Sequence, residues 1–328
     1  MGLRAYIAKK LVYTFVLIFF VATVNFVIFM LMPGDPTAVF ASSARLKSEE
    51  QVKAVRKLFG LDDPLYIRYF KYIQNMFTFN FGFSYYTGRL VSEELGRRLQ
   101  NTLLLVGLST IFSIIIGTIL GIVCAAKRGK TWDTFLVTTS LVTYSLPSFW
   151  LGMVLLLIFA SWLHWFPMGG VVPASWAQHP PSNIFEEIQG RAYHLFLPVL
   201  TLTIFQYGGY LLLTRAVMLE ALTEDYIVTA RAKGVKERTV LFKHALKNAS
   251  LPLITNIALS FGFMLSGAII TEQVFTYPGL GLWLWNAIAF VDYPVLQAMF
   301  FIIALCVIFA NFIADLLYGV IDPRIRYG

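Results

Sequence analysis

The sequence predicts an all-α integral membrane protein with six transmembrane helices and with both termini in the cytoplasm. Hydrophobic residues make up 58% of the 328 residues, and charged residues make up only 13%. A soluble domain carries about 25% charged residues, so half of the usual solvating groups are missing. The 29 Phe, 16 Tyr and 7 Trp residues suit the aromatic belts at both surfaces of a bilayer. Uncharged runs and the distribution of Lys and Arg complete the prediction.

Six uncharged runs are each long enough to cross the membrane. About 20 residues at ~1.5 Å per residue span ~30 Å of hydrocarbon, and a backbone in lipid must satisfy its own hydrogen bonds, so we expect helices. The first run follows two lysines, as in a signal peptide, but its 22 residues exceed the roughly 7–15 of a signal sequence, so we expect an uncleaved span. The six runs are 11–32, 103–126, 134–163, 195–214, 249–271 and 293–314.

Positive charge gives the expected orientation, because Lys and Arg in short loops mark the cytoplasmic side. On the opposite side, the second loop holds only Arg191 and the third holds neither Lys nor Arg. The first outer loop is basic too, but loops beyond about 60 residues cross largely regardless of charge. The cytoplasmic set is Arg4, Lys9, Lys10, Lys127, Arg128, Lys130, Arg215, Arg231, Lys233, Lys236, Arg238, Lys243, Lys247, Arg324 and Arg326. We therefore expect a multi-pass protein of the cell (plasma or inner) membrane.

One further uncharged segment lies between Glu272 and Asp292 and includes Trp283 and Trp285. Its stretch 277–281, Tyr-Pro-Gly-Leu-Gly, breaks a helix. We expect residues 282–291 to form a short re-entrant or interfacial helix on the outer side instead of a seventh span.

The predicted organisation has three parts. Residues 1–32 form the N-terminal tail and the first helix, and residues 33–102 form an extracytoplasmic loop domain with short helices at 48–59 and 64–77. This domain is either a compact cap on the outer mouth or a contact for a partner that delivers substrate. Residues 103–328 form a five-helix core with a cytoplasmic loop at 215–250.

A short capped helix is expected within that cytoplasmic loop. Thr223 is a suitable N-cap, acidic residues follow in the first turn and basic residues close the last turn, as the helix dipole favours. Gly234 then ends the helix, and Tyr226, Ile227 and Ala230 form a small apolar stripe. Such a helix suits docking into a groove of another protein, and a helix resting on anionic lipid is equally compatible with the pattern.

Motifs along nearly the whole chain resemble the dipeptide/oligopeptide ABC importer permeases, B-type subunit. The most specific is Asp-Tyr-Ile-Val-Thr-Ala-Arg-Ala-Lys-Gly at 225–234, followed by His-Ala-Leu-Lys-Asn-Ala at 244–249 and Pro252. The other matching stretches are Pro-Gly-Asp-Pro at 33–36, 60–66, 267–272, 277–281, 292–294, 315–319 and 322–324.

The resemblance implies a type I ABC importer permease fold and a set of partners. These are a related second permease in a heterodimer, two cytoplasmic ATPase subunits that bind ATP and Mg, and an extracytoplasmic substrate-binding protein. The chain itself would hold no cofactor, no metal and no catalytic residue. The short cytoplasmic helix would couple it to an ATPase through Glu224, Asp225, Tyr226, Ala230, Arg231, Lys233 and Gly234. Val228 stands where the generic loop motif carries an acidic residue.

Polar residues within the apolar spans are candidates for the translocation path. Hydrogen bonding between helices explains them equally well. They are Tyr144, Ser145, Gln206, Tyr207, Asn256, Ser260 and Ser266. Pro147 and Pro198 lie within or near the third and fourth spans, where we expect kinks.

The function expected from these features is ATP-driven import of di- or oligopeptides. Oligosaccharides or another solute are the alternative substrates within the family. A self-sufficient channel or secondary transporter would show internal repeats and paired midplane charges, which the sequence lacks. A membrane enzyme is disfavoured because nucleophile, base and metal ligands do not cluster. Gly129-Lys130-Thr131 mimics the end of a phosphate-binding loop, but Cys124 replaces the glycine that the pattern requires.

Overall fold

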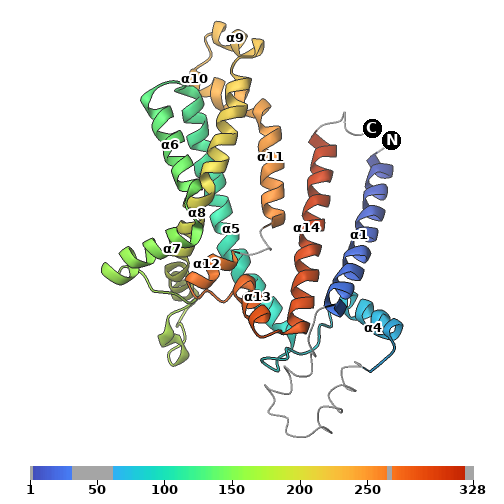
Figure 1. Cartoon of the computed structure of the whole chain (residues 1–328). Helices are drawn as coiled ribbons and strands as arrows, with labels where there is room; N and C mark the ends of the chain where they lie inside the picture. Colours follow the sequence, from blue (N-terminus) through green and yellow to red (C-terminus); the bar gives the residue numbers. More distant parts are fainter. Residues whose placement is uncertain (1–2, 32–61, 264–267, 322–328) are drawn as a thin grey trace.

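The computed structural model describes residues 3–31, 62–263 and 268–321, and within these ranges the chain is helical and has no strand. The expected helix at 48–59 and the candidate path residue Ser266 lie outside the described residues. Figure 1 shows α9 at one end of the molecule and α12 and α13 at the opposite end. We call these the α9 end and the α13 end.

Within the described residues, four helices are long and apolar enough to cross a membrane, and each coincides with a predicted span. They are α1 (Leu3–Leu31), α5 (Val91–Ala126), α8 (Ile184–Ala221) and α14 (Tyr293–Ile321). The start of α1 and the end of α14 lie at the α9 end, as Figure 1 shows. The chain therefore crosses the length of the molecule an even number of times between these two points.

The predicted third span, 134–163, is not one continuous helix and bends sharply at the expected kink near Pro147. The segment consists of α6 (Thr131–Ser145) and α7 (Ser148–Leu155), which continues as a π-helix over Leu156–Trp162. The two parts meet at an angle of 99°. Pro147 causes the break, because its ring disfavours helical geometry in the preceding residue, and Leu146 is extended with φ −75° and ψ 137°. Pro198, by contrast, lies within the continuous helix α8.

The fifth predicted span, 249–271, is also not one helix. Helix α11 (Leu246–Phe263) begins three residues earlier and contains Pro252. Ala268 is non-helical, with φ −101° and ψ 62°, and a separate short helix α12 (Ile269–Val274) follows. The expected short helix near 282–291 is present as α13 (Leu280–Ala289), and the expected helix at 64–77 is present as α4 (Leu65–Phe77).

Helices α5 and α8 make the most extensive helix–helix contact in the described part of the fold. Gly117 and Gly121, one turn apart on α5, face α8. A Cβ atom at Gly117 would lie 2.5 Å from the Cβ of Tyr210, and one at Gly121 would lie 2.6 Å from the Cβ of Thr214. Small residues at four-residue spacing allow helices to approach closely in membranes, so these glycines set the distance between α5 and α8.

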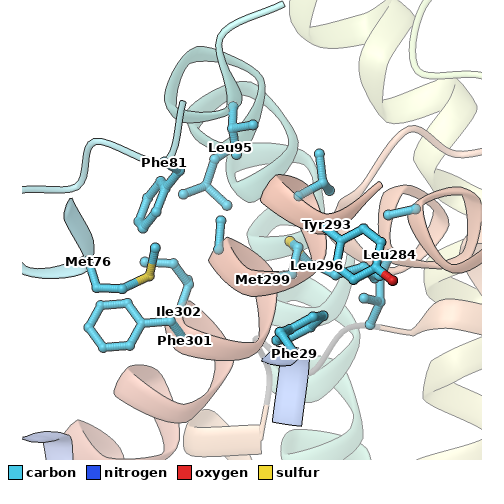
Figure 2. Close-up of a cluster of buried hydrophobic side chains, with 14 of the residues drawn as sticks. Phe29, Met76, Phe81, Leu95, Leu284, Tyr293, Leu296, Met299, Phe301 and Ile302 are labelled. Atoms are coloured by element: carbon cyan, nitrogen blue, oxygen red, sulfur yellow. The ribbon is translucent and has the colours of Figure 1, made fainter. Parts of the chain in front are cut away.

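A hydrophobic cluster joins α1, α4, α13 and α14 at the α13 end (Figure 2). Phe29 of α1 packs against Tyr293 and Phe300 of α14, with ring centroids 6.2 and 5.9 Å apart. Met76 of α4 and Leu284 of α13 are buried in the same cluster. The cluster fixes α13 next to α14, and so positions one wall of the site described next.

Candidate functional site

A cavity of about 900 Å³ lies among α5, α8, α11, α12 and α13. Three of the seven predicted path residues, Gln206 on α8 and Asn256 and Ser260 on α11, line it. Its full lining is Val106, Thr110, Ser148, Leu202, Phe205, Gln206, Asn256, Leu259, Ser260, Ala268, Ile269, Ile270, Thr271, Leu284, Trp285 and Ile288. The hydroxyl of Tyr210 donates a 2.7 Å hydrogen bond to Ser260 Oγ and links α8 to α11 beside the cavity.

The remaining path candidates are not part of the lining. Tyr144 is exposed and stacks on Phe205, with ring centroids 6.1 Å apart. The hydroxyl of Ser145 donates to the carbonyl of Leu141 in its own helix, at 2.7 Å. Tyr207 is half-buried on α8 outside the lining, and Ser266 lies outside the described residues. The structure therefore brings together three of these seven residues.

The α13 end of the cavity has a wall that the sequence did not reveal. Thr271 of α12 and Leu284, Trp285 and Ile288 of α13 form it. The uncharged segment at 273–291 signalled a short helix, but nothing local in it shows that this helix packs against α5. This wall lies on the side of the cavity opposite α9.

The described lining residues are apolar or neutral and polar, and none is ionisable at neutral pH. Hydroxyl and amide groups donate and accept hydrogen bonds, and the aliphatic and aromatic side chains supply apolar contacts. The cavity can therefore bind an amide- or hydroxyl-rich solute through hydrogen bonds without selecting for one sign of charge.

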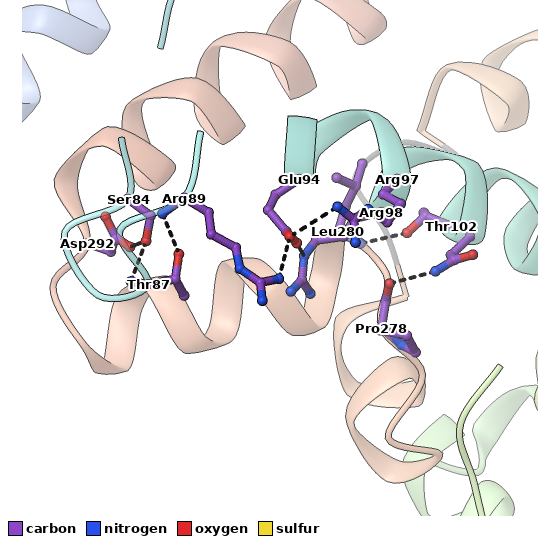
Figure 3. Close-up of polar contacts among 11 residues, drawn as sticks. Ser84, Thr87, Arg89, Glu94, Arg97, Arg98, Thr102, Pro278, Leu280 and Asp292 are labelled. Carbon is purple, nitrogen blue, oxygen red and sulfur yellow. Dashed lines mark hydrogen bonds and ion pairs between the residues drawn. The ribbon is translucent and has the colours of Figure 1, made fainter. Parts of the chain in front are cut away.

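Polar groups anchor the wall to the loop 78–90 and to the start of α5 (Figure 3). Glu94, buried in the first turn of α5, forms ion pairs with Arg89 at 3.1 Å and Arg98 at 3.2 Å. The guanidinium of Arg98 also lies over the ring of Trp283, 5.2 Å from its centroid. One carboxylate thus orders an arginine that holds α13 from outside the cavity.

The short helix expected in the cytoplasmic loop is present as α9 (Asp225–Ala232). Its expected N-cap is wrong, because the N-cap residue is Glu224 and its side chain makes no capping bond. The hydroxyl of Thr223 instead donates to the carbonyl of Glu220 at 2.7 Å, within the last turn of α8. Thr223 therefore ends α8 and does not begin α9.

The end of α9 matches the expected glycine stop. Gly234 has φ +75°, the left-handed conformation that glycine adopts without steric cost. The amide of Val235 donates to the carbonyl of Ala230 at 3.3 Å, and that of Gly234 donates to the carbonyl of Arg231 at 2.9 Å. This pair of bonds is the Schellman motif. Lys233, just before the glycine, is exposed.

The apolar stripe of α9 faces the protein itself. Ile227 is 0% exposed and Ala230 is 7% exposed, and Tyr226 is half-buried beside them. These three residues pack on the ends of α5 and α8 and on the π-helical segment Val240–Ala245, which leads into α11. The buried members of this hydrophobic cluster are Ile122, Ala125, Met218, Ala221, Ile227, Ala230, Val240, Ala245 and Ala249. This corrects the expected docking face, because only the opposite face, with Asp225 and Val228, is exposed to a partner.

An ion pair braces the turn after α9. Arg231 Nη2 lies 2.7 Å from Glu237 Oε1, and Arg231 Nε donates to Glu237 Oε2 at 3.2 Å. The hydrogen bonds from Arg231 hold the pKa of the Glu237 carboxyl below its ordinary value. The pair closes the turn over Gly234, so the exit of α9 has a fixed direction.

Comparison with known proteins decides the family. The model of the "Binding-protein-dependent transport system inner membrane component" family matches residues 117–327, and the model of the N-terminal region of the same membrane component matches residues 3–106. The chain is 38% identical to the oligopeptide transport system permease protein AppB of Bacillus subtilis (strain 168), over 99% of this chain and 100% of the relative. The chain belongs to this transport permease family.

Two further relatives extend the match across bacteria. The di/tripeptide transport system permease protein DppB of Pseudomonas aeruginosa (strain UCBPP-PA14) is 36% identical, over 98% of this chain and 99% of the relative. The glutathione transport system permease protein GsiC of Escherichia coli (strain K12) is also 36% identical over the same shares. The family resemblance drawn from the sequence motifs is confirmed, and this transport permease is a multi-pass protein of the plasma membrane.

A second ion pair ties the helices of the permease together near the α9 end. Arg215 of α8 donates to both carboxylate oxygens of Asp133, at 2.7 and 2.9 Å. Asp133 also accepts from the amide of Gly129 at 2.9 Å. The pair fixes the turn between α5 and α6 to the last part of α8.

In the described part of the permease, no three His, Cys, Asp or Glu side chains are grouped closely enough to hold a metal ion.

Proposed function

We propose that this chain is the transmembrane permease subunit of an ATP-driven ABC importer for di- and oligopeptides, and that it forms half of the translocation path. The observation that carries the proposal is a neutral cavity of about 900 Å³ inside a chain that matches transport permeases along its whole length. A peptide presents amide donors and acceptors along its backbone, and Gln206, Asn256 and Ser260 offer the complementary groups. The names of the relatives, which specify oligopeptides, di/tripeptides and glutathione, support this substrate class.

The proposed topology has six membrane-crossing segments with both termini in the cytoplasm. Helices α1, α5, α8 and α14 supply four, and α6 and α11 supply the other two. The start of α1 and the end of α14 lie at the α9 end in Figure 1, which agrees with an even number of crossings. The α9 end is then the cytoplasmic end, where the basic loop 215–250 lies.

The proposed partners are a related second permease, two cytoplasmic ATPase subunits and an extracytoplasmic substrate-binding protein. ATP and Mg bind to the ATPase subunits, and this chain contributes no catalytic group and no cofactor site. Helix α9 is the coupling element, because its buried face is packed on α5, α8 and the segment leading into α11. A partner that moves α9 therefore moves helices that line the cavity.

Within α9, the residues proposed to contact an ATPase are those on the exposed side and at its two ends. Glu224, Asp225, Arg231, Lys233 and Gly234 are exposed. Tyr226 and Ala230 contribute by holding the helix to the rest of the chain. The same architecture serves an importer of oligosaccharides or another solute, which is the second candidate, since amides and hydroxyls bind both classes.

Reconstitution tests the function directly. The complete complex, with both permeases, the ATPases and the binding protein, is placed in proteoliposomes, and uptake of a labelled tripeptide and of a labelled trisaccharide is measured with and without ATP. We expect ATP-dependent uptake of the tripeptide alone. Uptake of the trisaccharide alone would reverse the substrate assignment. Uptake by this chain without ATPase subunits would refute the importer proposal and favour a channel or secondary transporter.

A further inference from the structure

Glu272 is a fully buried carboxylate that no part of the proposed transport cycle uses. It lies on α12, directly after the cavity-lining Thr271, and is 0% exposed. One carboxylate oxygen accepts a hydrogen bond from the hydroxyl of Thr102 on α5 at 2.8 Å. The other accepts from the backbone amide of Leu282 in the first turn of α13, at 2.9 Å. One side chain therefore connects three helices.

Thr102 completes the connection to α13. Its hydroxyl accepts a hydrogen bond from the amide of Leu280, at 2.8 Å, while it donates to Glu272. The first amides of a helix have no partner within the helix, and the N-cap residue of α13, Gly279, has no side chain that could cap them. The start of α13 is therefore capped by side chains of α5 and α12, and a negative charge there is also favoured by the helix dipole.

The turn before α13 is shaped around the same carboxylate. A Cβ atom at Gly279 would overlap the carboxylate of Glu272, so only glycine fits there without a shift. The side-chain amide of Asn101 donates to the carbonyl of Pro278 at 3.0 Å, and the hydroxyl of Tyr277 donates to the carbonyl of Asn101 at 3.1 Å. The two hydrogen bonds with Asn101 join the turn at 277–279 to α5 (Figure 3 shows the Pro278 and Leu280 contacts).

The other end of α13 is held by the loop 78–90. The carboxylate of Asp292 accepts from the hydroxyl of Ser84, as Figure 3 shows, and also from the amide of Tyr85. The rings of Tyr86 and Phe290 stack with centroids 3.9 Å apart. Among the described residues, the hydrogen bond that joins α13 to α5 lies at the Glu272 end, and α5 itself lines the cavity.

From this geometry we propose that Glu272 is a positioning residue that holds α13 in place as the wall closing the cavity at the α13 end. The proposal rests on the proposed function and names a contact that regulates access to the same cavity. Moving α13 away from α5 would cost the buried carboxylate one of its two donors, which is Leu282 if α12 stays with α5 and Thr102 if α12 moves with α13, and an unpaired buried group is costly. The Glu272–Thr102 contact therefore favours the closed wall, and it must break or move as a unit when the wall opens.

A matched pair of substitutions at Thr102 tests the proposal. Thr102→Val keeps the shape of the side chain and removes the hydroxyl, whereas Thr102→Ser keeps the hydroxyl. Each is combined with Ser260→Cys, which places a thiol in the cavity, in a background where Cys124 and Cys306 are replaced by serine. The complete complex in right-side-out membrane vesicles without ATP is then treated with a membrane-impermeant maleimide, and the labelling rate is measured.

We expect Thr102→Val to raise the labelling rate about tenfold, the effect of losing one hydrogen bond to a charged group. Thr102→Ser should label at the rate of the parent. Equal rates for the valine and serine variants would overturn the proposal. If Thr102→Val does not assemble, Glu272→Gln is held to the same criterion, because its amide nitrogen replaces one of the two accepting oxygens. Failure of both variants to assemble would show that the network serves folding alone and would also overturn it.

Labelling needs no transported solute, so it separates this proposal from the proposed function. A complex that takes up no peptide but shows the expected difference between Thr102→Val and Thr102→Ser would refute the substrate assignment and support the positioning role. A complex that imports peptide but labels the Thr102→Val and Thr102→Ser variants at equal rates would support the substrate assignment and refute the positioning role.

Discussion

Asp133 and Arg215 form a two-point ion pair, with donor–acceptor distances of 2.7 and 2.9 Å, that joins the start of α6 to α8. The side chain of Asp133 is only 6% exposed and that of Arg215 is 28% exposed. A buried charge that loses its partner is strongly destabilising, by about 3–5 kcal/mol. We expect Arg215→Met to lower the unfolding temperature of the complex clearly. The double variant Asp133→Asn, Arg215→Met should recover much of the loss, and additive losses in a thermal unfolding series would show that the pair is not coupled.

Close packing of α5 on α8 predicts opposite effects of the same substitution at two glycines of α5. Gly121→Ala would place a Cβ atom 2.6 Å from the Cβ of Thr214 and 2.7 Å from the carbonyl oxygen of Leu211. Such overpacking costs about 1–3 kcal/mol. Gly96→Ala on the same helix meets no atom within 4 Å and should be neutral or slightly stabilising, because alanine favours helix by up to about 1 kcal/mol. Thermal unfolding in detergent distinguishes the two, and equal shifts would contradict this packing.

The end of α9 predicts a graded series at Gly234. Its φ of +75° strains any residue with a β-carbon, yet a Cβ atom there meets nothing within 4 Å. The cost is therefore conformational, about 1–2 kcal/mol for most residues and less for asparagine. We expect Gly234→Val to reduce ATP-dependent uptake relative to ATP hydrolysis, and Gly234→Asn to retain most of it. If the two variants transport equally well, the direction of the chain after α9 does not matter for coupling.

The ion pair of Arg231 with Glu237 predicts a pH dependence with a defined sign. Arg231 lowers the pKa of Glu237 in the folded protein, so the stabilisation is complete above the unfolded value of about 4.3 and is lost as the pH falls through the lower folded value. Glu237 is 55% exposed, so the contribution is below about 1 kcal/mol. The difference in unfolding temperature between the parent and Glu237→Gln should be constant from pH 6 to 8 and shrink below about pH 4. A difference that changes between pH 6 and 8 would implicate another group.

The cavity lining predicts which of the polar candidates affect transport. Asn256→Leu removes a hydrogen-bonding group from the cavity wall, and one neutral hydrogen bond of about 1 kcal/mol corresponds to roughly a fivefold loss in uptake. Ser145→Ala alters a hydroxyl that bonds only to its own helix among the described contacts and should leave uptake unchanged. Peptide uptake at limiting concentration is the measurement. A larger effect of Ser145→Ala would place the path outside this cavity.

Local sequence patterns were enough to predict a helix where the residues of that helix themselves determine its position and its end. The long apolar runs gave α1, α5, α8 and α14, and Gly234 correctly marked the end of α9. The kinks expected at the two prolines had different outcomes. Pro147 breaks a predicted span by 99°, whereas Pro198 lies inside a continuous helix. Pro198 is buried in the packed part of α8, while α7 after Pro147 carries exposed apolar residues, so tertiary packing decided an outcome that sequence left open.

The site shows the same limit more strongly. Glu272 and Thr102 lie 170 positions apart, and no periodicity or local motif pairs them. The apolar stripe of α9 was visible in the sequence, but its partner, the cluster around Met218 and Val240, depends on how α8 and α11 meet. Residues that act through distant neighbours therefore require the fold, whereas caps, stops and spans do not.

The neutral lining of the cavity has a consequence for the speed of transport. A transported solute with charged termini contacts hydroxyls, amides and hydrocarbon in the lining contributed by this chain, and it meets no charged side chain there that would bind it strongly. Passage requires affinity high enough for entry and low enough for release, and a wall of weak, interchangeable contacts gives a shallow energy profile with short residence times. The rate of the transport cycle is then set by the motion of the helices, and solutes of different composition should be transported at similar rates.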